Sequence, residues 1–265
     1  MPMIHPTALI DVSVDVPNDT VVGAFCVIER GVRLGHRVNI GAHAVLKSGT
    51  VLGDEVRIHA GVVLGDDPQI IGQAFNFESS VFIGDRTVLR EGVTVHRASK
   101  PHQATRIGCD CLLMAFSHVG HDAVVGNGCI LANLALVAGC VTVENHAFLS
   151  GGSMIHQFVC IGESAFVSGN AEITMHIPPF VTVLDRNIVS NLNLVGLRRR
   201  GFSSDEIIDI KQQYRSVYGG NSLSFQKKAL SALETNAFKT DRGRQFLTFF
   251  SNQTYDRGFV YPRNE

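Results

Sequence analysis

Tryptophan is absent from this 265-residue chain, and aromatic residues make up only 8% of it. No stretch approaches the roughly 18 consecutive apolar residues of a membrane-spanning helix, and the N-terminus lacks a basic segment followed by an apolar run. Neither sign of charge is in excess, because 23 basic residues nearly balance 24 acidic ones. These absences argue against stable membrane insertion and against nucleic-acid binding, and we expect a cytoplasmic protein.

The six cysteines lack the regular spacing of a disulfide framework, which favours free thiols in a reducing compartment. Cys109 and Cys111 form a single C-x-C pair with no second pair to complete a metal site, so we assign them a structural role and predict no metal.

A strict six-residue spacing of aliphatic residues dominates the first two thirds of the chain. An α-helix repeats near every 3.6 residues and a strand every 2, so neither explains a period of six. Such a period is typical of a β-solenoid, in which three short faces make a triangular coil and coils stack roughly 4.8 Å apart. The spaced residues are Ile10, Val16, Val22, Ile28, Leu34, Ile40, Leu46, Leu52, Ile58 and Leu64, followed by Ile107, Leu113, Val119, Val125, Leu131, Val137, Val143, Leu149, Ile155, Ile161, Val167 and Ile173.

We therefore predict a left-handed parallel β-helix over residues 1–190, taking the hand from hexapeptide solenoids as a class and against the usual right-handed rule. Glycine often follows the inward residue, as in Leu52-Gly53, and is expected to support backbone angles that a side chain resists. The segments 66–81 and 98–106 break the pattern and are predicted loops. In solenoids such insertions cluster on one face and often serve binding.

Residues 191–265 lose the six-residue period and are predicted to form an α-helical domain that caps the open end of the solenoid. The run from Ser203 to Glu206 has the pattern of a helix start, and a second helical stretch is expected from Leu223.

The most chemically informative motif is His118-Val119-Gly120-His121-Asp122. Val119 is an inward position, so both histidines should point outward, where an imidazole with a pKa near ~6.5 can act as a general base. Asp122 can hold the tautomer of that base. Eighteen residues after His121 comes Gly139, whose bare N–H could stabilise an oxyanion, and eighteen further comes Gln157 beside His156. The spacing predicts a column of a base and an amide donor, the minimum apparatus for acyl transfer.

The alternative is a pair of solvated surface histidines with no catalytic role. His43, His59 and His96 are expected at coil corners, as polar groups at an interface. Less simply, three histidines from stacked coils could hold a metal, within one chain or across a subunit boundary. Asn193 and the run Arg198-Arg199-Arg200 lie where the solenoid passes to the helices. Guanidinium groups match phosphate oxygens, but a solvated charge run is an equally good reading.

At these residues the chain resembles the UDP-N-acetylglucosamine O-acyltransferases of lipid A biosynthesis, within the hexapeptide acyltransferases. The resemblance covers nearly the whole chain, and its most specific parts are the His-x-x-His-Asp motif and the segment 196–203. The matching stretches are His5-Pro6-Thr7-Ala8, Ile83-Gly84-Asp85, Val93-Thr94-Val95-His96-Arg97, Leu112-Leu113-Met114, His118-x-x-His121-Asp122, Val125-Gly126-Asn127, Cys129-Ile130-Leu131-Ala132-Asn133, His156-Gln157-Phe158, Pro178-Pro179 and Gly196-Leu197-Arg198-Arg199-Arg200-Gly201-Phe202-Ser203.

The resemblance implies a homotrimer with active sites between subunits, and an acyl carrier protein that delivers a 3-hydroxyacyl thioester on its phosphopantetheine, with no other cofactor. It implies that His121 deprotonates the sugar hydroxyl, that Asp122 orients the His121 ring and that the Gly139 N–H stabilises the oxyanion. It also implies that Gly169 limits the acyl channel, where a glycine leaves room for a long chain. The positions implied to surround the UDP-sugar are Gln69, His118, His156, Gln157, Asn193, Arg199 and Arg200.

Three departures from the family pattern concern the acceptor. The family's first loop reads Gln-Asp-Leu-Lys, whereas this chain has Gln69-Ile70-Ile71-Gly72; a family His falls at Cys140 and a family Glu at Val195. Losing charged partners of a ligand changes affinity by several kcal/mol. The acceptor could therefore be a modified nucleotide sugar. Two other classes remain open, a metal-dependent lyase resembling the hexapeptide carbonic anhydrases and a non-catalytic trimeric scaffold.

Overall fold

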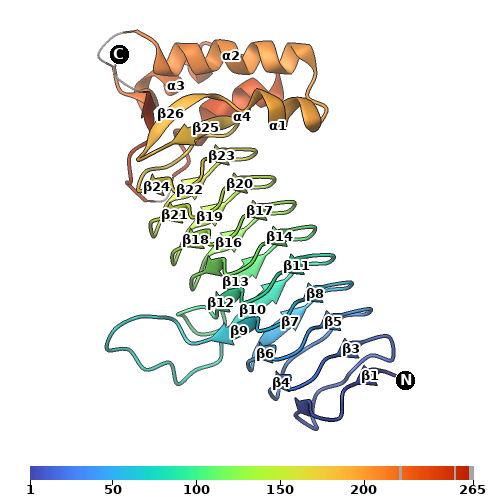
Figure 1. Cartoon of the computed structure of the whole chain (residues 1–265). Coiled ribbons are helices and arrows are strands. Elements are labelled where there is room, and N and C mark those ends of the chain that lie inside the picture. Colours follow the sequence, from blue (N-terminus) through green and yellow to red (C-terminus); the bar gives the residue numbers. More distant parts are fainter. Residues whose placement is uncertain (221–222, 254, 263–265) are drawn as a thin grey trace.

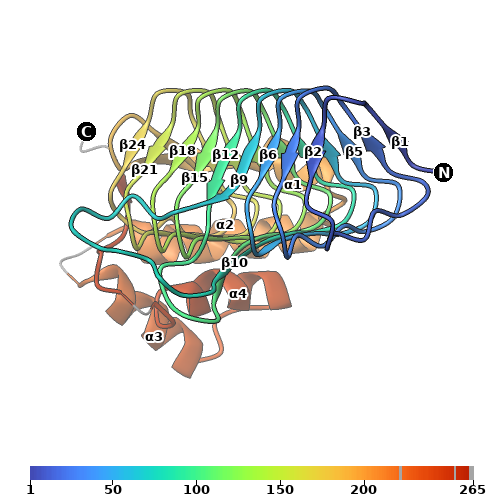
Figure 2. The same cartoon turned by 90° about the horizontal axis from the view of Figure 1, so that it is seen from below.

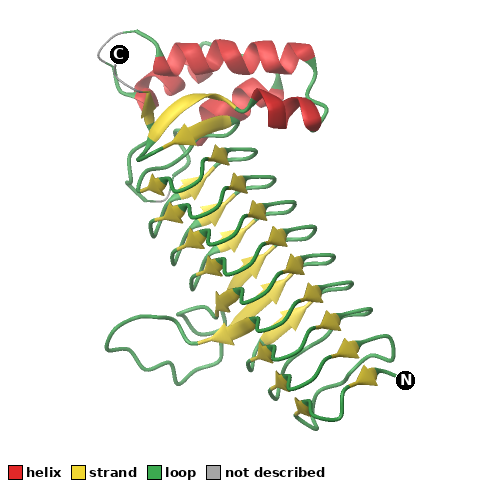
Figure 3. Ribbon diagram, viewed as in Figure 1, coloured by secondary structure: helices red, strands yellow, loops and turns green. Residues whose placement is uncertain are grey.

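The computed structural model describes residues 1–220, 223–253 and 255–262. Within them the chain forms a left-handed β-helix followed by four helices that lie together at one end of it (Figure 1). Figure 3 shows the contrast between the short strands of the coils and the helices beyond the last coil. Both the fold class and the order of the two parts agree with the prediction from sequence.

Three sheets of stacked, nearly all parallel strands make the three faces of the prism. The first face consists of β1 (Met3–Ile4), β3 (Val21–Val22), β5 (Asn39–Ile40), β8 (Arg57–Ile58), β11 (Val88–Leu89), β14 (Leu112–Leu113), β17 (Ile130–Leu131), β20 (Phe148–Leu149), β23 (Phe166–Val167), β25 (Val181–Leu184), β26 (Ile188–Leu192) and β27 (Tyr261–Pro262). The second face consists of β2 (Leu9–Ile10), β4 (Val27–Ile28), β6 (Val45–Leu46), β9 (Val63–Asp66), β12 (Thr94–His96), β15 (His118–Val119), β18 (Leu136–Val137), β21 (Met154–Ile155) and β24 (Glu172–Ile173). The third face consists of β7 (Thr50–Leu52), β10 (Ser80–Ile83), β13 (Ala104–Ile107), β16 (Val124–Val125), β19 (Thr142–Val143) and β22 (Cys160–Ile161).

The six-residue spacing builds the core, because each inward side chain stacks on its equivalent in the next coil. All twelve aliphatic residues of the second run are buried, and seven of the ten in the first run are too. Ile10, Val16 and Leu34 are only partly buried, since the coils at the N-terminal end of the stack have fewer neighbours to cover them. Removing aliphatic side chains from water on this scale is the main source of stability of the solenoid.

The glycine after the inward residue lets successive coils pack closely and does not adopt unusual backbone angles. Our expectation about these angles was therefore wrong. Gly53 does not have a positive φ. A Cβ there would lie 2.9 Å from the backbone N of Asp85 in the next coil, so a side chain would push the coils apart. The left-handed conformation falls instead on residues further round the corner, such as Glu55 (φ 59°) and Asp122 (φ 60°).

Two segments leave the coil at the edge between the second and third faces, one between β9 and β10 and one between β12 and β13. The predicted loops 66–81 and 98–106 cover these segments but also include residues of β9, β10 and β13. Leu52 pairs with Ile83, 31 positions on rather than 18, and the extra residues lie between β9 and β10. Ile83 pairs with Ile107, 24 positions on, which explains why the second insertion keeps the phase. The loop between β9 and β10 projects sideways from the prism in both Figure 1 and Figure 2.

The C-terminal region contains α1 (Leu194–Arg199), α2 (Ser204–Tyr218), α3 (Phe225–Glu234) and α4 (Asp241–Phe249). Helix α2 begins as predicted, with Ser203 as N-cap in a reciprocal capping box with Glu206. The second helical stretch begins at Phe225 after the N-cap Ser224, not at Leu223, and it is divided into α3 and α4 by a second cap at Thr240.

The β-helix and the C-terminal region share both a sheet and a hydrophobic core. Residue 190 lies within β26, which pairs antiparallel with β25 and is joined by β27 from the C-terminal end of the chain. The region 191–265, expected to be helical, therefore contributes a strand to the first face. A single hydrophobic cluster runs from the coils into the helices. The division at residue 190 stays a prediction.

Candidate active site

The turn between β15 and β16 presents a hydrogen-bonded histidine and aspartate. The Nδ1 of His121 lies 2.7 Å from Oδ2 of Asp122, and the two side chains are 18% and 13% exposed. A carboxylate at Nδ1 favours the tautomer that carries its proton there, which leaves Nε2 free to accept one. The prediction of two solvated histidines is therefore wrong for His121, because its ring is mostly covered and one nitrogen is already engaged.

Asp122 is itself held from the second insertion. Its carboxylate accepts hydrogen bonds from the backbone N–H of Ser99 at 3.0 Å and from the Ser99 hydroxyl at 2.5 Å, and its own N–H donates to Thr105 Oγ1 at 2.8 Å. Burial alone would raise the pKa of Asp122, but the hydrogen bonds from Ser99 and His121 outweigh it and lower this pKa below its usual value. The carboxylate therefore stays charged and accepts the hydrogen bond from His121 Nδ1.

Gly139 lies directly beneath the imidazole, one coil further on. The register pairs Val119 with Val137, and the N–H of Cys140 donates to the carbonyl of His121 at 2.9 Å. A Cβ on Gly139 would lie 2.5 Å from Nε2 of His121, so only glycine leaves room for the ring. Within the described chain the Gly139 N–H has no acceptor. The stacking that the 18-residue spacing predicts is present, with His121 Nε2 beside Gly139. The roles of base and oxyanion donor stay predictions.

A cavity of about 540 Å³ surrounds this column. Gly139 and His121 line it together with four of the side chains that the resemblance assigns to the UDP-sugar: Gln69, His118, His156 and Gln157. Leu136 and Met154 of the second face supply an apolar wall, and both side chains are substantially exposed. Six of the predicted site residues thus line one cavity, and Asp122, which is hydrogen-bonded to His121, is the seventh at this place.

His118, the first histidine of the motif, is partly buried and contacts Thr94 and His96. Its Nδ1 lies 2.7 Å from Thr94 Oγ1, and its ring meets the ring of His96 edge to face at 4.8 Å between centroids. Burial, followed by the nearby His96 and His121, lowers the pKa of His118 to about 4, so this side chain is neutral near pH 7. His96 is itself buried within β12 rather than exposed at a corner, contrary to our expectation.

Arg97 organises the first insertion, and sequence reasoning had not singled it out. Its guanidinium pairs with Asp67 at 2.7 Å, and it donates to the carbonyl oxygens of Phe75 at 2.7 Å and Phe77 at 2.6 Å. The side chain is only 11% exposed. Arg97 therefore ties both ends of the loop that carries Gln69 to the coil next to the cavity.

Four predicted site residues lie elsewhere on the prism. Asn193 and Arg200 contact the segment 163–164, at the edge between the third and first faces, whereas His121 lies at the edge between the second and third. Arg199 is exposed at the end of α1, one residue before Arg200. Gly169 lies between β23 and β24, at the remaining edge, where a Cβ would be 3.3 Å from the carbonyl of Gly151. One chain does not unite these residues with the histidines.

The arginine run is only partly a solvated charge run. Arg198 and Arg199 are exposed, but the Arg200 guanidinium pairs with Glu163 at 3.1 Å and donates to the Ser164 hydroxyl. Asn193 caps α1 by accepting from the N–H of Gly196 at 3.0 Å and also donates to the carbonyl of Ser164 at 3.0 Å. The arginines end α1 rather than begin it, where positive charge complements the helix dipole.

Glu163 holds several of these groups at once. Beyond Arg200 it accepts from Gln245 at 2.8 Å and from Arg242 at 3.2 Å, both on α4. Burial alone would raise the pKa of Glu163, but these partners lower it below its usual value. The sequence did not predict that Glu163 would bind these side chains, because its partners lie 37 to 82 positions further along the chain.

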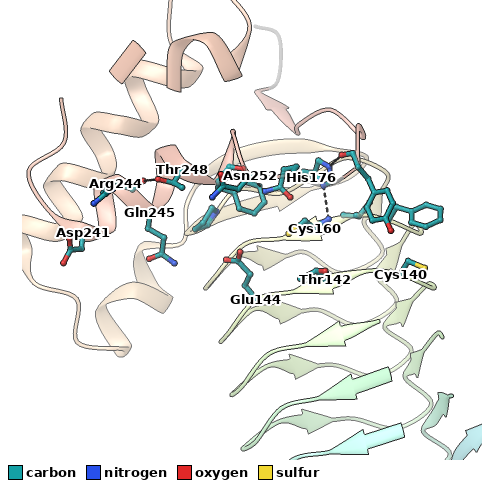
Figure 4. A pocket seen from close by; sticks show the side chains of 16 residues that line it. Cys140, Thr142, Glu144, Cys160, His176, Asp241, Arg244, Gln245, Thr248 and Asn252 are labelled. Atoms are coloured by element: carbon teal, nitrogen blue, oxygen red, sulfur yellow. Dashed lines mark hydrogen bonds between the residues drawn. The ribbon is translucent and has the colours of Figure 1, made fainter. Parts of the chain in front are cut away.

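A second cavity, of about 620 Å³, lies between the third face and α4 (Figure 4). Its polar lining includes Glu144, Cys160 and His176 on the coils, and Arg244 and Gln245 on α4. Burial raises the pKa of Cys160 to about 12, so the thiol is neutral and a poor nucleophile. His176 is occupied on both nitrogens, by the Cys160 N–H and the Tyr255 carbonyl. In this cavity His176, unlike His121 in the first, has no free ring nitrogen.

The described residues contain a single group of three or more potential metal ligands, made of His121, Asp122 and Cys140. The three-histidine site considered from sequence does not form within the described part of the chain. His43 stacks on Phe25 at 5.1 Å between centroids, and His59 pairs with Glu91 at 3.3 Å.

A left-handed β-helix built from six-residue repeats is the fold of the hexapeptide transferases. Comparison with known proteins narrows the class. Residues 104–139 match the family profile described as bacterial transferase hexapeptide (six repeats), and residues 177–260 match domain 2 of UDP-N-acetylglucosamine O-acyltransferase.

Curated relatives match over the full length. The chain is 44% identical to a protein of Chlorobaculum parvum and 47% identical to one of Chlorobium phaeobacteroides, in both cases over 100% of each chain. Both are named acyl-(acyl-carrier-protein)–UDP-N-acetylglucosamine O-acyltransferase. Among solved structures, the UDP-N-acetylglucosamine acyltransferase of Francisella novicida has a TM-score of 0.92 at 28% identity, covering 99% of this chain and 95% of its own. The chain therefore belongs to the UDP-N-acetylglucosamine O-acyltransferase family and is an enzyme.

Proposed function

We propose that this enzyme transfers a 3-hydroxyacyl group from acyl carrier protein to the 3-hydroxyl of UDP-N-acetylglucosamine, the first step of lipid A biosynthesis. The observation that carries the proposal is the position of His121 Nε2 directly over Gly139, with Asp122 on the opposite nitrogen. Relatives named for this reaction match the whole chain, which supports the same donor and acceptor here.

In the proposed mechanism His121 Nε2 accepts the proton of the sugar 3-hydroxyl while that oxygen attacks the thioester carbonyl carbon. The carbonyl oxygen becomes an oxyanion and accepts a hydrogen bond from the Gly139 N–H. Collapse of the tetrahedral intermediate breaks the carbon–sulfur bond, and the imidazolium returns its proton to the departing pantetheine sulfur. Asp122 stabilises the imidazolium throughout and does not itself take up the proton.

The acceptor is proposed to bind in the cavity beside this column. Gln69, His118, His156 and Gln157 line the cavity and would surround the nucleotide sugar. Because Asn193, Arg199 and Arg200 lie at another edge of the prism, they would reach the same acceptor only from a neighbouring subunit. A homotrimer with sites between subunits meets this requirement, since a closed ring brings one surface of each chain against a different surface of the next.

The acyl chain is proposed to pass by Gly169. A glycine at this position leaves more space than any other residue, which supports a long acyl group. Mass spectrometry of the product reports the chain length directly, and a preference for short acyl groups would contradict this part of the proposal.

A modified nucleotide sugar, with an amine in place of the 3-hydroxyl, is the second candidate acceptor. The observation that favours it lies in the first insertion, where Ile70 and Gly72 replace acidic and basic residues of the family pattern and the Ile71 side chain is fully exposed. Cys140 and Val195 are further departures. The His121–Gly139 chemistry serves either acceptor, because both an amine and a hydroxyl must lose a proton to acylate.

The two other classes have weaker support. A carbonic-anhydrase-like lyase needs three histidines around a metal, and no such group forms within the described chain. A scaffold would not need an engaged histidine–aspartate pair over an unpaired amide.

We further propose that acyl carrier protein is the one macromolecular donor, that no cofactor beyond its phosphopantetheine is needed, and that the enzyme works in the cytoplasm. All six cysteines are free thiols, which suits a reducing compartment. No helix in the described ranges is long and apolar enough to cross a bilayer.

The test is an assay of 3-hydroxyacyl carrier thioester against a panel of UDP-sugars, with His121→Ala as the variant. We expect acylation of one UDP-sugar and a loss of kcat on the order of 10²–10⁴-fold in the variant, the usual contribution of a general base. The matched control is His36→Ala, which removes an exposed histidine also paired with a carboxylate, Asp19 at 3.3 Å. Near-normal turnover by His121→Ala would end the proposal.

A further inference from the structure

The thiol of Cys140 lies beside the histidine–aspartate pair, and the acyl-transfer mechanism leaves it unused. One ligand atom each from His121, Asp122 and Cys140 lies within 4.8 Å of the other two. Among the described residues this is the one place where three such groups converge.

The backbone explains why these side chains converge. Asp122 and Cys140 occupy equivalent positions on successive coils, and both have a φ of 60°. Because the two residues share one corner conformation, their side chains leave the corner in the same direction. The hydrogen bond from Cys140 N–H to His121 carbonyl oxygen, at 2.9 Å, fixes the two coils against each other at this corner.

The corner is also reachable from outside. His121 lines the first cavity, Cys140 lines the second, and none of the three residues is fully buried. Figure 4 shows Cys140 on the outer turn of its coil, with its sulfur directed away from the prism. A small cation therefore has a path to the cluster and an open side on which to keep a water ligand.

The donor set of one nitrogen, one oxygen and one sulfur is the set that zinc prefers. Zinc binds imidazole nitrogen and carboxylate oxygen at about 2.0–2.2 Å and thiolate sulfur at about 2.3 Å, so tetrahedral ligands lie roughly 3.6 Å apart. The ligand atoms of His121 and Asp122, 2.7 Å apart, are closer than this, and no separation within the group exceeds 4.8 Å, which is about 1.2 Å too long. Small side-chain rotations of all three residues can supply both changes. Three protein ligands and one open position describe an accessible site rather than a closed structural one.

We propose that His121, Asp122 and Cys140 form an inhibitory site for Zn²⁺ or a similar thiophilic divalent cation. Bound metal takes the place of the proton between His121 and Asp122 and engages groups that catalysis needs. The occupied enzyme cannot take a proton from the acceptor, so the cation acts as a reversible inhibitor and not as a cofactor. The presence of the thiol makes this property specific to chains with cysteine at this corner.

The binding test uses the metal-free protein and Co²⁺, whose bonds to thiolate sulfur give an intense near-ultraviolet absorption. We expect one equivalent of Co²⁺ to produce this band, and Zn²⁺ to displace it. Cys140→Ser should lose the band and weaken Zn²⁺ binding at least about tenfold, since loss of even an outer partner of a metal site costs that much. Cys109→Ser is the matched control, because Cys109 is a partly buried free thiol at another edge of the prism and should leave both readings unchanged.

The inhibition test rests on the proposed function, and the binding test does not. In the acyltransferase assay with chelated buffer, Zn²⁺ should inhibit the wild-type and the Cys109→Ser enzymes at the same concentration and the Cys140→Ser enzyme only at a concentration at least about tenfold higher. Absence of the cobalt–thiolate band, or equal Zn²⁺ affinity in the Cys140→Ser variant, would overturn the site. A metal-free enzyme that acylates no UDP-sugar would instead contradict the proposed function and leave the binding result standing.

Discussion

At the scale of single residues, the site depends on how little space separates His121 from Gly139. The imidazole occupies the volume where a Cβ of residue 139 would be. The spacing of the sequence was enough to predict this stacking, because the coil length is 18 residues and the register has no irregularity between β15 and β21. It was not enough to predict Ser99 as the residue that holds Asp122, because Ser99 belongs to an insertion with no period.

We predict that Gly139→Ala folds and loses activity. The added methyl group would lie 2.5 Å from His121 Nε2 and 2.6 Å from Cε1, so the ring must turn away while the backbone can remain in place. We expect kcat to fall on the order of 10²-fold or more, because displacing the base and crowding the oxyanion donor act together. Thermal unfolding should change by only a few degrees. A variant with full kcat would mean that Gly139 is not in the reaction centre.

A second prediction concerns the pH dependence of stability. The pKa of His118 is about 4 in the folded chain and near ~6.5 when unfolded, so below pH 6.5 the unfolded state takes up the proton first. Stability is therefore fully present above that pH and is lost progressively as the pH falls toward 4. Between pH 7 and pH 4 the free energy of unfolding of His118→Gln should therefore fall by on the order of 2 kcal/mol less than that of the wild type. Urea unfolding across this pH range measures the difference.

Some pH dependence should remain in His118→Gln, because burial also lowers the pKa of His96 and of His176. A pH profile identical to wild type would mean that His118 is solvated in the folded protein.

At the scale of elements, the two insertions make one edge of the solenoid different from the other two. Every coil presents the same three faces, so an edge of the solenoid becomes distinct only where chain is added. Both insertions emerge at the edge that carries His121, where one supplies Ser99 and the other supplies Gln69. The sequence indicated where the period is interrupted and whether its phase is kept. It did not indicate that Arg97 holds the first insertion or that Ser99 of the second holds Asp122.

We predict that Arg97→Ala raises the KM for the UDP-sugar roughly 10- to 100-fold and lowers kcat much less. The reason is that the loop between β9 and β10 would lose its pairing with Asp67 and its bonds to Phe75 and Phe77. Charge-assisted hydrogen bonds of this kind contribute about 1.5–3 kcal/mol each when buried. Hydrogen exchange should rise in residues 67–79 and not in the coils.

The control for this experiment is Arg90→Ala, which removes an exposed arginine that pairs with its own neighbour Glu91 at 3.1 Å. It should leave KM and exchange unchanged. If Arg97→Ala bound the acceptor normally, the loop would have no part in recognition.

At the scale of the whole molecule, the separation of the site residues is the main observation. A prism holds its edges apart, so His121 at one edge and Arg200 at another cannot act on one acceptor within a single chain. Glu163 and α4 fix Arg200 in place on its own edge. A symmetric trimer would place the two edges together three times.

We predict that inactive His121→Ala and Arg200→Ala chains restore activity when co-expressed. In a ring where each site takes His121 from one chain and Arg200 from the next, random mixing of equal amounts leaves about one quarter of the sites intact. Differently tagged chains allow mixed trimers to be isolated, and light scattering gives their mass. Activity no greater than the sum of the two variants would contradict sites shared between subunits.

The sequence by itself determined the solenoid, its register and the column of His121 over Gly139. It could do so because an aliphatic residue must point inward once per face, and this constraint repeats at a fixed spacing that survives the second insertion unchanged. Only the tertiary structure decided where the insertions fold, that Glu163 would engage Arg200, and that the Cys140 thiol would lie beside His121 and Asp122. These depend on contacts between residues far apart in the chain, for which no local pattern exists.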